Sequence, residues 1–200
     1  MIRDLTNELA SKLVGVPYAE VIGGLANVLE YGEEEGRTKR MPYTEDIYVN
    51  DDCKVGKTTA LVPNSRKKGV IYFEDRGTTF TGRTAHGFTY RSDFRLVLWY
   101  NRVAIFGDKN ASTTAAIASD LLRKINAGKT HNLGFFARLS LIPQTFKERD
   151  KSIFSPYTYS EKETQYLMPP FDYFAIDFKA TYSVSANCIN ELELNPEICY

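Results

Sequence analysis

One long segment in the last third of the chain, residues 171–184, alternates apolar and polar side chains. Successive side chains of a strand point to opposite faces of a sheet, so this pattern predicts a strand with one apolar face. The apolar face carries Phe174, Ile176, Phe178, Ala180, Tyr182 and Val184, and the other face carries Lys179, Thr181 and Ser183. A second segment, Phe88 to Arg102, repeats the alternation. Two long half-buried strands predict a largely antiparallel sheet.

Two further segments have the spacing of amphipathic helices. From Ile2 to Leu13, leucine and isoleucine recur at every third or fourth position, and Gly15 ends the pattern. Residues 112–127 show the same spacing, and Ser112 or Thr113 can cap their N-terminus. The C-terminal two thirds therefore predict the order strand, helix, strand, strand.

The composition fits one hydrophobic core. The chain has 200 residues, of which 43% are hydrophobic, and no shift in composition divides it. We expect a single domain over residues 1–185, followed by a C-terminal arm at 186–200. The arm keeps several apolar side chains, which predicts that it docks on its own domain or on a neighbouring chain.

Between these elements the sequence predicts turns and connections. Glu33 to Gly36 has the composition of a hairpin turn, with Arg37 to Tyr43 as the return strand. Long polar loops are expected at 50–87 and 144–170, and the strand that begins near residue 135 is expected to stop at Pro143. Ser160 and Glu163 have the spacing of a capping box.

The charge balance and the cysteines narrow the range of possible functions. Lys plus Arg and Asp plus Glu number 25 each, which removes the general attraction of a basic protein to nucleic acid. Three scattered cysteines argue against a secreted disulfide framework. Neither a signal peptide nor a long apolar run appears, so we expect a soluble protein made in a cytoplasm, without a membrane partner.

One short motif matches the end of a phosphate-binding loop. Gly56-Lys57-Thr58 has the required residues, but the full pattern places another glycine five positions earlier and a helix directly afterwards. Position 51 is Asp51, whose carboxylate would repel a phosphate. Pro63 follows too closely for a good helix. We therefore predict no nucleotide or other cofactor here.

Catalytic and metal-binding patterns are equally weak. His86, His131 and the three cysteines have none of the short spacings that place two metal ligands on one element. Asp172 and Asp177 are carboxylates suited in principle to acid–base work, but their positions fit an exposed strand face. We predict that the protein is not an enzyme and has no catalytic, cofactor-binding or metal-binding residues.

A basic cluster, Arg66-Lys67-Lys68, has the chemistry to contact phosphates. A charged turn tip at the surface is the more frequent explanation of such a cluster, and we favour it here.

The order of the predicted elements resembles the tail-terminator and tail-completion proteins of tailed bacteriophages, which form a ring between head and tail. The resemblance spans most of the chain and rests on the order of elements, without a short signature motif. Its elements are the opening helix Ile2 to Leu13, the glycine-broken hairpin around Val21-Ile22-Gly23-Gly24-Leu25, the strand Phe88 to Arg102, the helix Ser112 to Ala127 and the closing strand Phe174 to Val184. This chain is longer than the family pattern at residues 50–87, 144–170 and 186–200.

The resemblance implies an α+β fold, a mostly antiparallel sheet with helices packed on one face and extended arms. It also implies a structural virion protein of the phage neck, assembled in the host bacterial cytoplasm as a ring of roughly six or twelve copies. The implied partners are the neighbouring connector and tail proteins, and DNA passes through the channel without sequence-specific binding.

Long arms are an easy source of contacts between neighbouring subunits. The candidate inter-subunit contacts are Phe80, His86, Phe154, Tyr157, Tyr159, Ile189, Leu192, Leu194, Ile198 and Tyr200. Two alternatives remain open. One is a cellular ligand-binding module that uses an aromatic sheet face. The other is a nucleotide-binding protein that uses Gly56-Lys57-Thr58.

Overall fold

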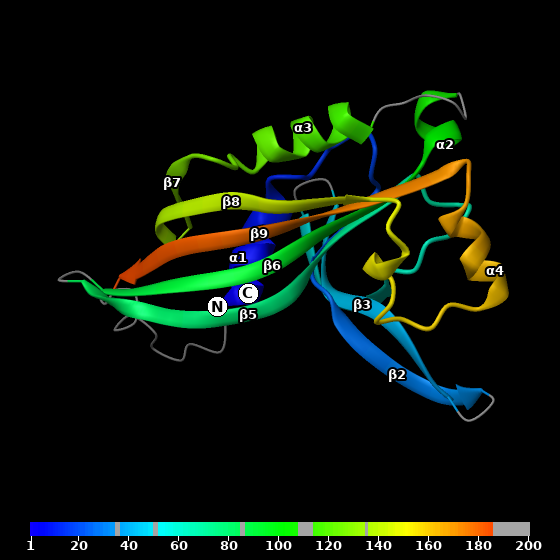
Figure 1. Ribbon diagram of the computed structural model, residues 1–200, viewed down its shortest axis with the longest axis horizontal. Helices are drawn as coiled ribbons and strands as arrows, with labels where there is room; N and C mark the ends of the chain where they lie inside the picture. Colours follow the sequence, from blue (N-terminus) through cyan, green and yellow to red (C-terminus); the bar gives the residue numbers. More distant parts are fainter. Residues whose placement is uncertain (35–36, 50–51, 85–86, 108–113, 135, 186–200) are drawn as a thin grey trace.

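A computed structural model describes residues 1–34, 37–49, 52–84, 87–107, 114–134 and 136–185 (Figure 1). Strands dominate these residues, and helical segments are few and short. In chain order the elements are α1 (Ile2–Ser11), β1 (Val21–Leu25), β2 (Asn27–Glu34), β3 (Arg37–Val49), β4 (Asp52–Ala60), β5 (Gly69–Thr84), β6 (Gly87–Asn101), α2 (Arg102–Phe106), α3 (Thr114–Lys124), β7 (Thr130–Leu133), β8 (Phe136–Glu148), the 3₁₀ turn η1 (Lys151–Ile153), α4 (Glu161–Thr164), the 3₁₀ turn η2 (Gln165–Leu167) and β9 (Phe171–Ser185).

Within the described residues, the strands form one mixed sheet of nine strands, in the order β2-β3-β1-β5-β6-β9-β8-β7, with β4 paired to β3. The β1–β5 pair is parallel and the other pairs are antiparallel. At the centre, β6 and β9 pair without a break from Gly87–Ser185 to Asn101–Phe171. These are the two long strands that the alternating pattern predicts.

The predicted fold class is wrong. The chain is β-rich: one large mixed sheet makes up most of the described residues, and the helices that pack on it are few and short. The loop expected at 50–87 contains two strands instead: residues 52–60 form β4, and residues 69–84 form β5. The physical reason is that threonine and phenylalanine suit strands even without apolar alternation, and β6 supplies a ladder partner along β5. The hairpin of β2 and β3 is confirmed.

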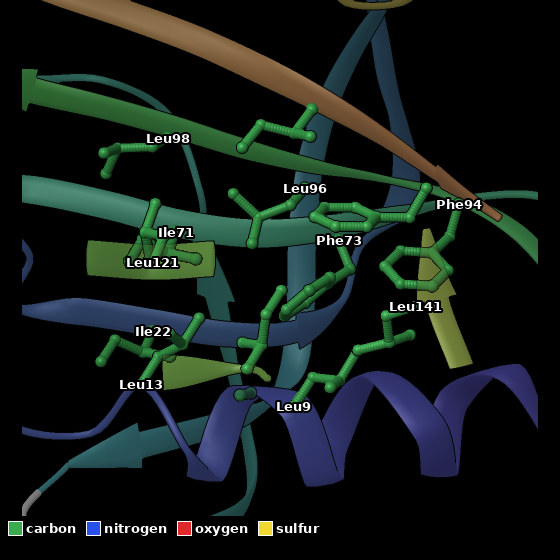
Figure 2. Close-up of a cluster of buried hydrophobic side chains, with 14 of the residues drawn as sticks. Leu9, Leu13, Ile22, Ile71, Phe73, Phe94, Leu96, Leu98, Leu121 and Leu141 are labelled. Carbon is green, nitrogen blue, oxygen red and sulfur yellow. The ribbon is translucent and has the colours of Figure 1, made fainter. Parts of the chain in front are cut away.

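One face of the sheet packs against α1 and α3 (Figures 1 and 2). Figure 2 shows Leu9 of α1, and Leu13 in the turn that follows it, below Ile22 and Ile71, with Leu121 of α3 beside them. Phe94 of β6 stacks on Phe178 of β9 with ring centroids 5.3 Å apart. All of these side chains are buried, so this layer is the main core.

The opposite face is covered by residues 151–167, which connect β8 to β9. Trp99 Nε1 donates a hydrogen bond to the Tyr166 carbonyl at 2.6 Å, and the Phe154 ring packs edge-on against Tyr173 at 5.0 Å. The capping box of Ser160 and Glu163 is confirmed. The expected loop at 144–170 is therefore in part strand, since β8 runs to Glu148, and in part a folded cover on the sheet.

Strand β8 continues past Pro143, where the sequence predicted its end. Pro143 lies opposite Phe178 and next to a register shift that separates it from Thr145. Proline lacks a backbone N–H, and it is tolerated at bulges and on strands whose outer side has no ladder partner. Beyond Leu141, β8 has a register shift at Pro143, and its outer side has no ladder partner among the described residues.

Candidate assembly surfaces

Several strands have one side without a ladder partner among the described residues, and two of these edges, on β2 and β8, lie at opposite ends of the strand order. Strand β2 is the first in the sheet order and pairs only with β3. At the other side, β7 pairs with β8 only as far as Ser140, so the rest of β8 pairs with β9 alone. Unpaired N–H and C=O groups on such edges can pair with another chain.

Both edges expose large apolar side chains. On the β2 edge, Val28 is 40% exposed and Leu29 is 37% exposed. On the β8 edge, which we define as residues 142–147, Ile142 and Phe146 are each 46% exposed. The Phe146 ring stays packed on Phe174, with ring centroids 5.1 Å apart. Each edge therefore offers apolar area next to unpaired backbone, a combination typical of protein–protein contacts.

A third unpaired stretch lies on β5. Strand β1 pairs with β5 only from Val70 to Phe73, so residues 75–83, here called the distal edge, pair with β6 alone among the described residues. Phe80, in the middle of this edge, is 57% exposed. In Figure 1 the distal edge lies at the end of the sheet where β9 also ends.

An aromatic row connects the distal edge to the core. The Phe80 ring lies 5.8 Å from Tyr90 and 6.1 Å from Phe88, measured between centroids. Tyr90 stacks on Tyr182, which packs edge-on against Phe136. The row is buried at Tyr182 and becomes exposed at Phe80, so the apolar face of the sheet continues beyond the core.

The other face of the same strands carries charge. The Arg95 guanidinium donates two hydrogen bonds to the Asp177 carboxylate, at 2.6 and 3.1 Å. Arg95 also lies 3.9 Å from Glu74, and Glu74 accepts a hydrogen bond from the Tyr157 hydroxyl at 2.7 Å. Burial and the nearby Glu74 carboxylate raise the pKa of Tyr157. Each charge has an opposite partner, so this cluster stabilises the fold.

Asp172 does not lie on an exposed face, which corrects the sequence interpretation. Its carboxylate is buried and accepts two hydrogen bonds from Arg149, at 2.9 and 2.8 Å. Arg102 lies 3.8 Å from the same carboxylate. Asp172 and Asp177 point to opposite faces of β9, so they do not form a carboxylate pair.

The predicted contact residues fall into three groups. Phe80 is exposed, as an inter-subunit contact requires. Phe154, Tyr157 and Tyr159, from the 144–170 segment, pack on the chain's own sheet. Phe154 is buried, and the two tyrosines are partly buried. The remaining candidates lie outside the described residues: His86, Ile189, Leu192, Leu194, Ile198 and Tyr200.

The Gly56-Lys57-Thr58 motif lies inside strand β4. A phosphate-binding loop instead wraps the phosphate between a strand and a helix, with its backbone amides turned toward the anion. The next element after β4 is strand β5, so the motif lacks the helix that this chemistry needs.

The basic cluster is divided. Lys67 turns inward, and its Nζ donates hydrogen bonds to the carbonyls of Ala60 and Val62 at 3.0 and 3.1 Å, while Arg66 and Lys68 are exposed. Burial lowers the pKa of Lys67. A hollow of about 630 Å³ lies beside Lys67, with Ser160, Glu163 and Tyr166 on its far wall. The Lys67 ammonium group therefore stabilises its own loop and does not point outward to contact phosphates.

The described residues contain no group of three or more His, Cys, Asp or Glu side chains arranged to bind a metal ion. Within the same part of the chain, every helix is too short or too polar to cross a lipid bilayer.

Sequence reasoning missed the apolar residues of the two outer edges. The sequence predicts the end of a strand at Ile142 and a loop at Phe146, and it gives no sign that Leu29 lies at a sheet edge. Their exposure depends on which strands end the sheet, and strand order follows from long-range pairing. The available signal was Pro143, because a proline inside a strand pattern favours an edge strand.

Comparisons with protein-family models and with curated proteins find no match to this chain.

Proposed function

We propose that this chain is a structural subunit that assembles head to tail into a closed ring, and that the ring forms part of the neck of a tailed bacteriophage. One observation carries the proposal. Two edges of the sheet, on β2 and on residues 142–147 of β8, each have one side without a ladder partner among the described residues, and both expose large apolar side chains.

A closed ring needs two different patches on each subunit, because each contact joins the first patch of one copy to the second patch of the next. The β2 and β8 edges satisfy this requirement. They lie on opposite sides of β1, β5, β6 and β9 in the sheet order, and Figure 1 shows β8 and β2 well apart. A contact that pairs β2 with a neighbour's β8 would continue the sheet from subunit to subunit and bury the exposed apolar groups.

The location in a phage neck is supported by the order of elements. An opening helix, a hairpin, a long central strand, a helix and a long closing strand follow one another as in tail-terminator and tail-completion proteins. The balance of 25 basic and 25 acidic residues suits a subunit packed beside many copies, because self-repulsion is small. In this role the ring joins the head connector to the tail, and DNA passes through it without being read.

The ligand-binding alternative has less support. An aromatic platform requires exposed rings in a concave site. The central rings Phe94, Trp99 and Phe178 are instead buried beneath the chain's own helices and the 151–167 cover. The nucleotide-binding alternative is disfavoured by the position of Gly56-Lys57-Thr58 within a strand.

The test uses one blocked edge per variant. Leu29→Lys places a charge on the β2 edge, and Phe146→Lys places one on the β8 edge. Each variant alone should remain monomeric, because every head-to-tail contact needs both edges. An equimolar mixture should give dimers and nothing larger, since only the intact β8 edge of the first variant can meet the intact β2 edge of the second. Light scattering after size exclusion measures these masses.

The matched control is Met168→Lys, which adds the same charge at a side chain that is 53% exposed and lies on neither edge. This variant should assemble like the unmodified protein. Rings formed by either edge variant alone would overturn the head-to-tail proposal.

A further inference from the structure

The distal edge of β5 has a specific occupant. We propose that residues 186–200 of the same chain add an antiparallel strand to this edge and cover Phe80. The contact is intramolecular and uses neither the β2 edge nor the β8 edge. This proposal is therefore independent of the ring proposal.

The distal edge is a surface that needs a cover. Residues 75–83 pair with β6 on one side only, and between two register shifts the run Thr78-Thr79-Phe80 carries no charge that would protect an exposed edge strand. Phe80 is 57% exposed, although its ring already contacts Phe88 and Tyr90. An added strand would pair the backbone of β5 and bury the exposed side of this ring.

The end of β9 is within reach. Ser185 pairs with Gly87 of β6, and Gly87 pairs with Thr84 of β5, so the chain leaves β9 beside the far end of the distal edge. A strand added outside β5 lies about 14 Å from β9, which is three inter-strand spacings. About four or five extended residues span that distance. The segment has 15 residues after Ser185, so about ten remain to run back along β5.

The side chains of the segment match the two faces of the edge. In Asn190-Glu191-Leu192-Glu193-Leu194, an extended chain places Leu192 and Leu194 on one face and the two glutamates on the other. The β5–β6 pair has the same division. Its aromatic face carries the exposed Phe80 ring.

The opposite face of the β5–β6 pair offers basic partners for the two glutamates. It carries Arg91, whose Nε is buried and has no hydrogen-bond acceptor among the described residues. The Arg91–Asp93 ion pair is 3.6 Å long and leaves that N–H unsatisfied. A carboxylate from the added strand would supply the missing acceptor.

Hydrogen exchange of the β5 backbone tests the proposal in the full chain. The double variant Leu192→Asp, Leu194→Asp removes the apolar face of the segment. The matched control is Asn187→Asp, Asn195→Asp, which adds the same charge and keeps both leucines. Amides of residues 78–83 should exchange about ten-fold faster in the leucine variant than in the unmodified protein or the control. Amides of residues 94–100, in the core part of β6, should be unchanged throughout.

Two results would overturn the proposal. The first is equally fast exchange of residues 78–83 in the unmodified protein and the leucine variant, which would show that nothing covers the edge. The second is protection that falls on dilution together with the oligomer mass, which would show that a second copy covers it. Protection that persists in the monomeric Leu29→Lys variant supports the intramolecular strand.

Discussion

Arg95 and Asp177 form a bidentate ion pair across strands β6 and β9 at the centre of the sheet, with Nε–Oδ1 at 2.6 Å and NH2–Oδ2 at 3.1 Å. Arg95 is nearly buried, and burial of a charge is costly unless the charge is paired and hydrogen-bonded. Through Glu74, the pair continues to the Tyr157 hydroxyl, which belongs to the 151–167 cover. The ion pair therefore joins the sheet to the layer that covers it.

Removing the Asp177 charge should destabilise the fold. Asp177→Asn leaves the guanidinium of Arg95 with Glu74 at 3.9 Å as its remaining charged partner. We expect the free energy of unfolding to fall by about 2 kcal/mol. The control is Asp93→Asn, because the Asp93–Arg91 pair is 3.6 Å long and about 40% exposed on both sides, where such a pair contributes about 0–1 kcal/mol. Urea unfolding of both variants measures the difference, and equal losses would show that the Arg95–Asp177 pair has no special role.

High pH should release the cover from the sheet. Tyr72 and Tyr157 have raised pKa values, chiefly because burial disfavours the phenolate and also because Glu74 is near. A group with a raised pKa in the folded state stabilises the fold fully below its unfolded pKa of about 10, and the contribution is lost as the pH rises above that value. Absorbance at 295 nm should therefore show these phenols ionising together with unfolding. Ionisation near pH 10 while the fold persists would contradict the packing of these rings.

Gly69 marks a close approach between two parts of the chain. A Cβ at this position would lie 2.1 Å from the Tyr18 carbonyl oxygen and 3.0 Å from the Trp99 carbonyl oxygen. Gly69→Ala should cost about 2–3 kcal/mol, because backbone on both sides must move. The matched control is Gly82→Ala on the same strand, where the nearest atom would be 3.5 Å away. Thermal unfolding should separate the two variants, and similar midpoints would mean that the strands yield easily.

The sequence predicts those elements whose pattern is local. The β6 and β9 strands follow from alternation over about 15 residues, and α1 follows from its leucine spacing and the glycine after it. The exposed half of β5, with its threonines and glycines, has no such pattern and is a strand because β6 pairs with it. The fold class was therefore wrong where tertiary pairing overrides local pattern.

The candidate contact surfaces were harder to predict from the sequence than the strands were. Phe80 was chosen as a contact for its position in a polar stretch, and it is exposed. Phe154 was chosen on similar grounds and is buried against Tyr173. An exposed and a buried aromatic side chain in polar surroundings look alike in sequence, because the difference depends on which segment folds back onto the sheet.

The mass of the purified protein in solution tests the central proposal most directly. A chain of 22.7 kDa that closes head to tail should give one discrete mass, a whole multiple of the chain, together with rings in negative-stain images. Phe146→Lys should reduce that mass to a single chain, because it blocks the β8 edge. A monomer at every concentration, with the same mass for the unmodified protein and the Phe146→Lys variant, would contradict assembly through the sheet edges.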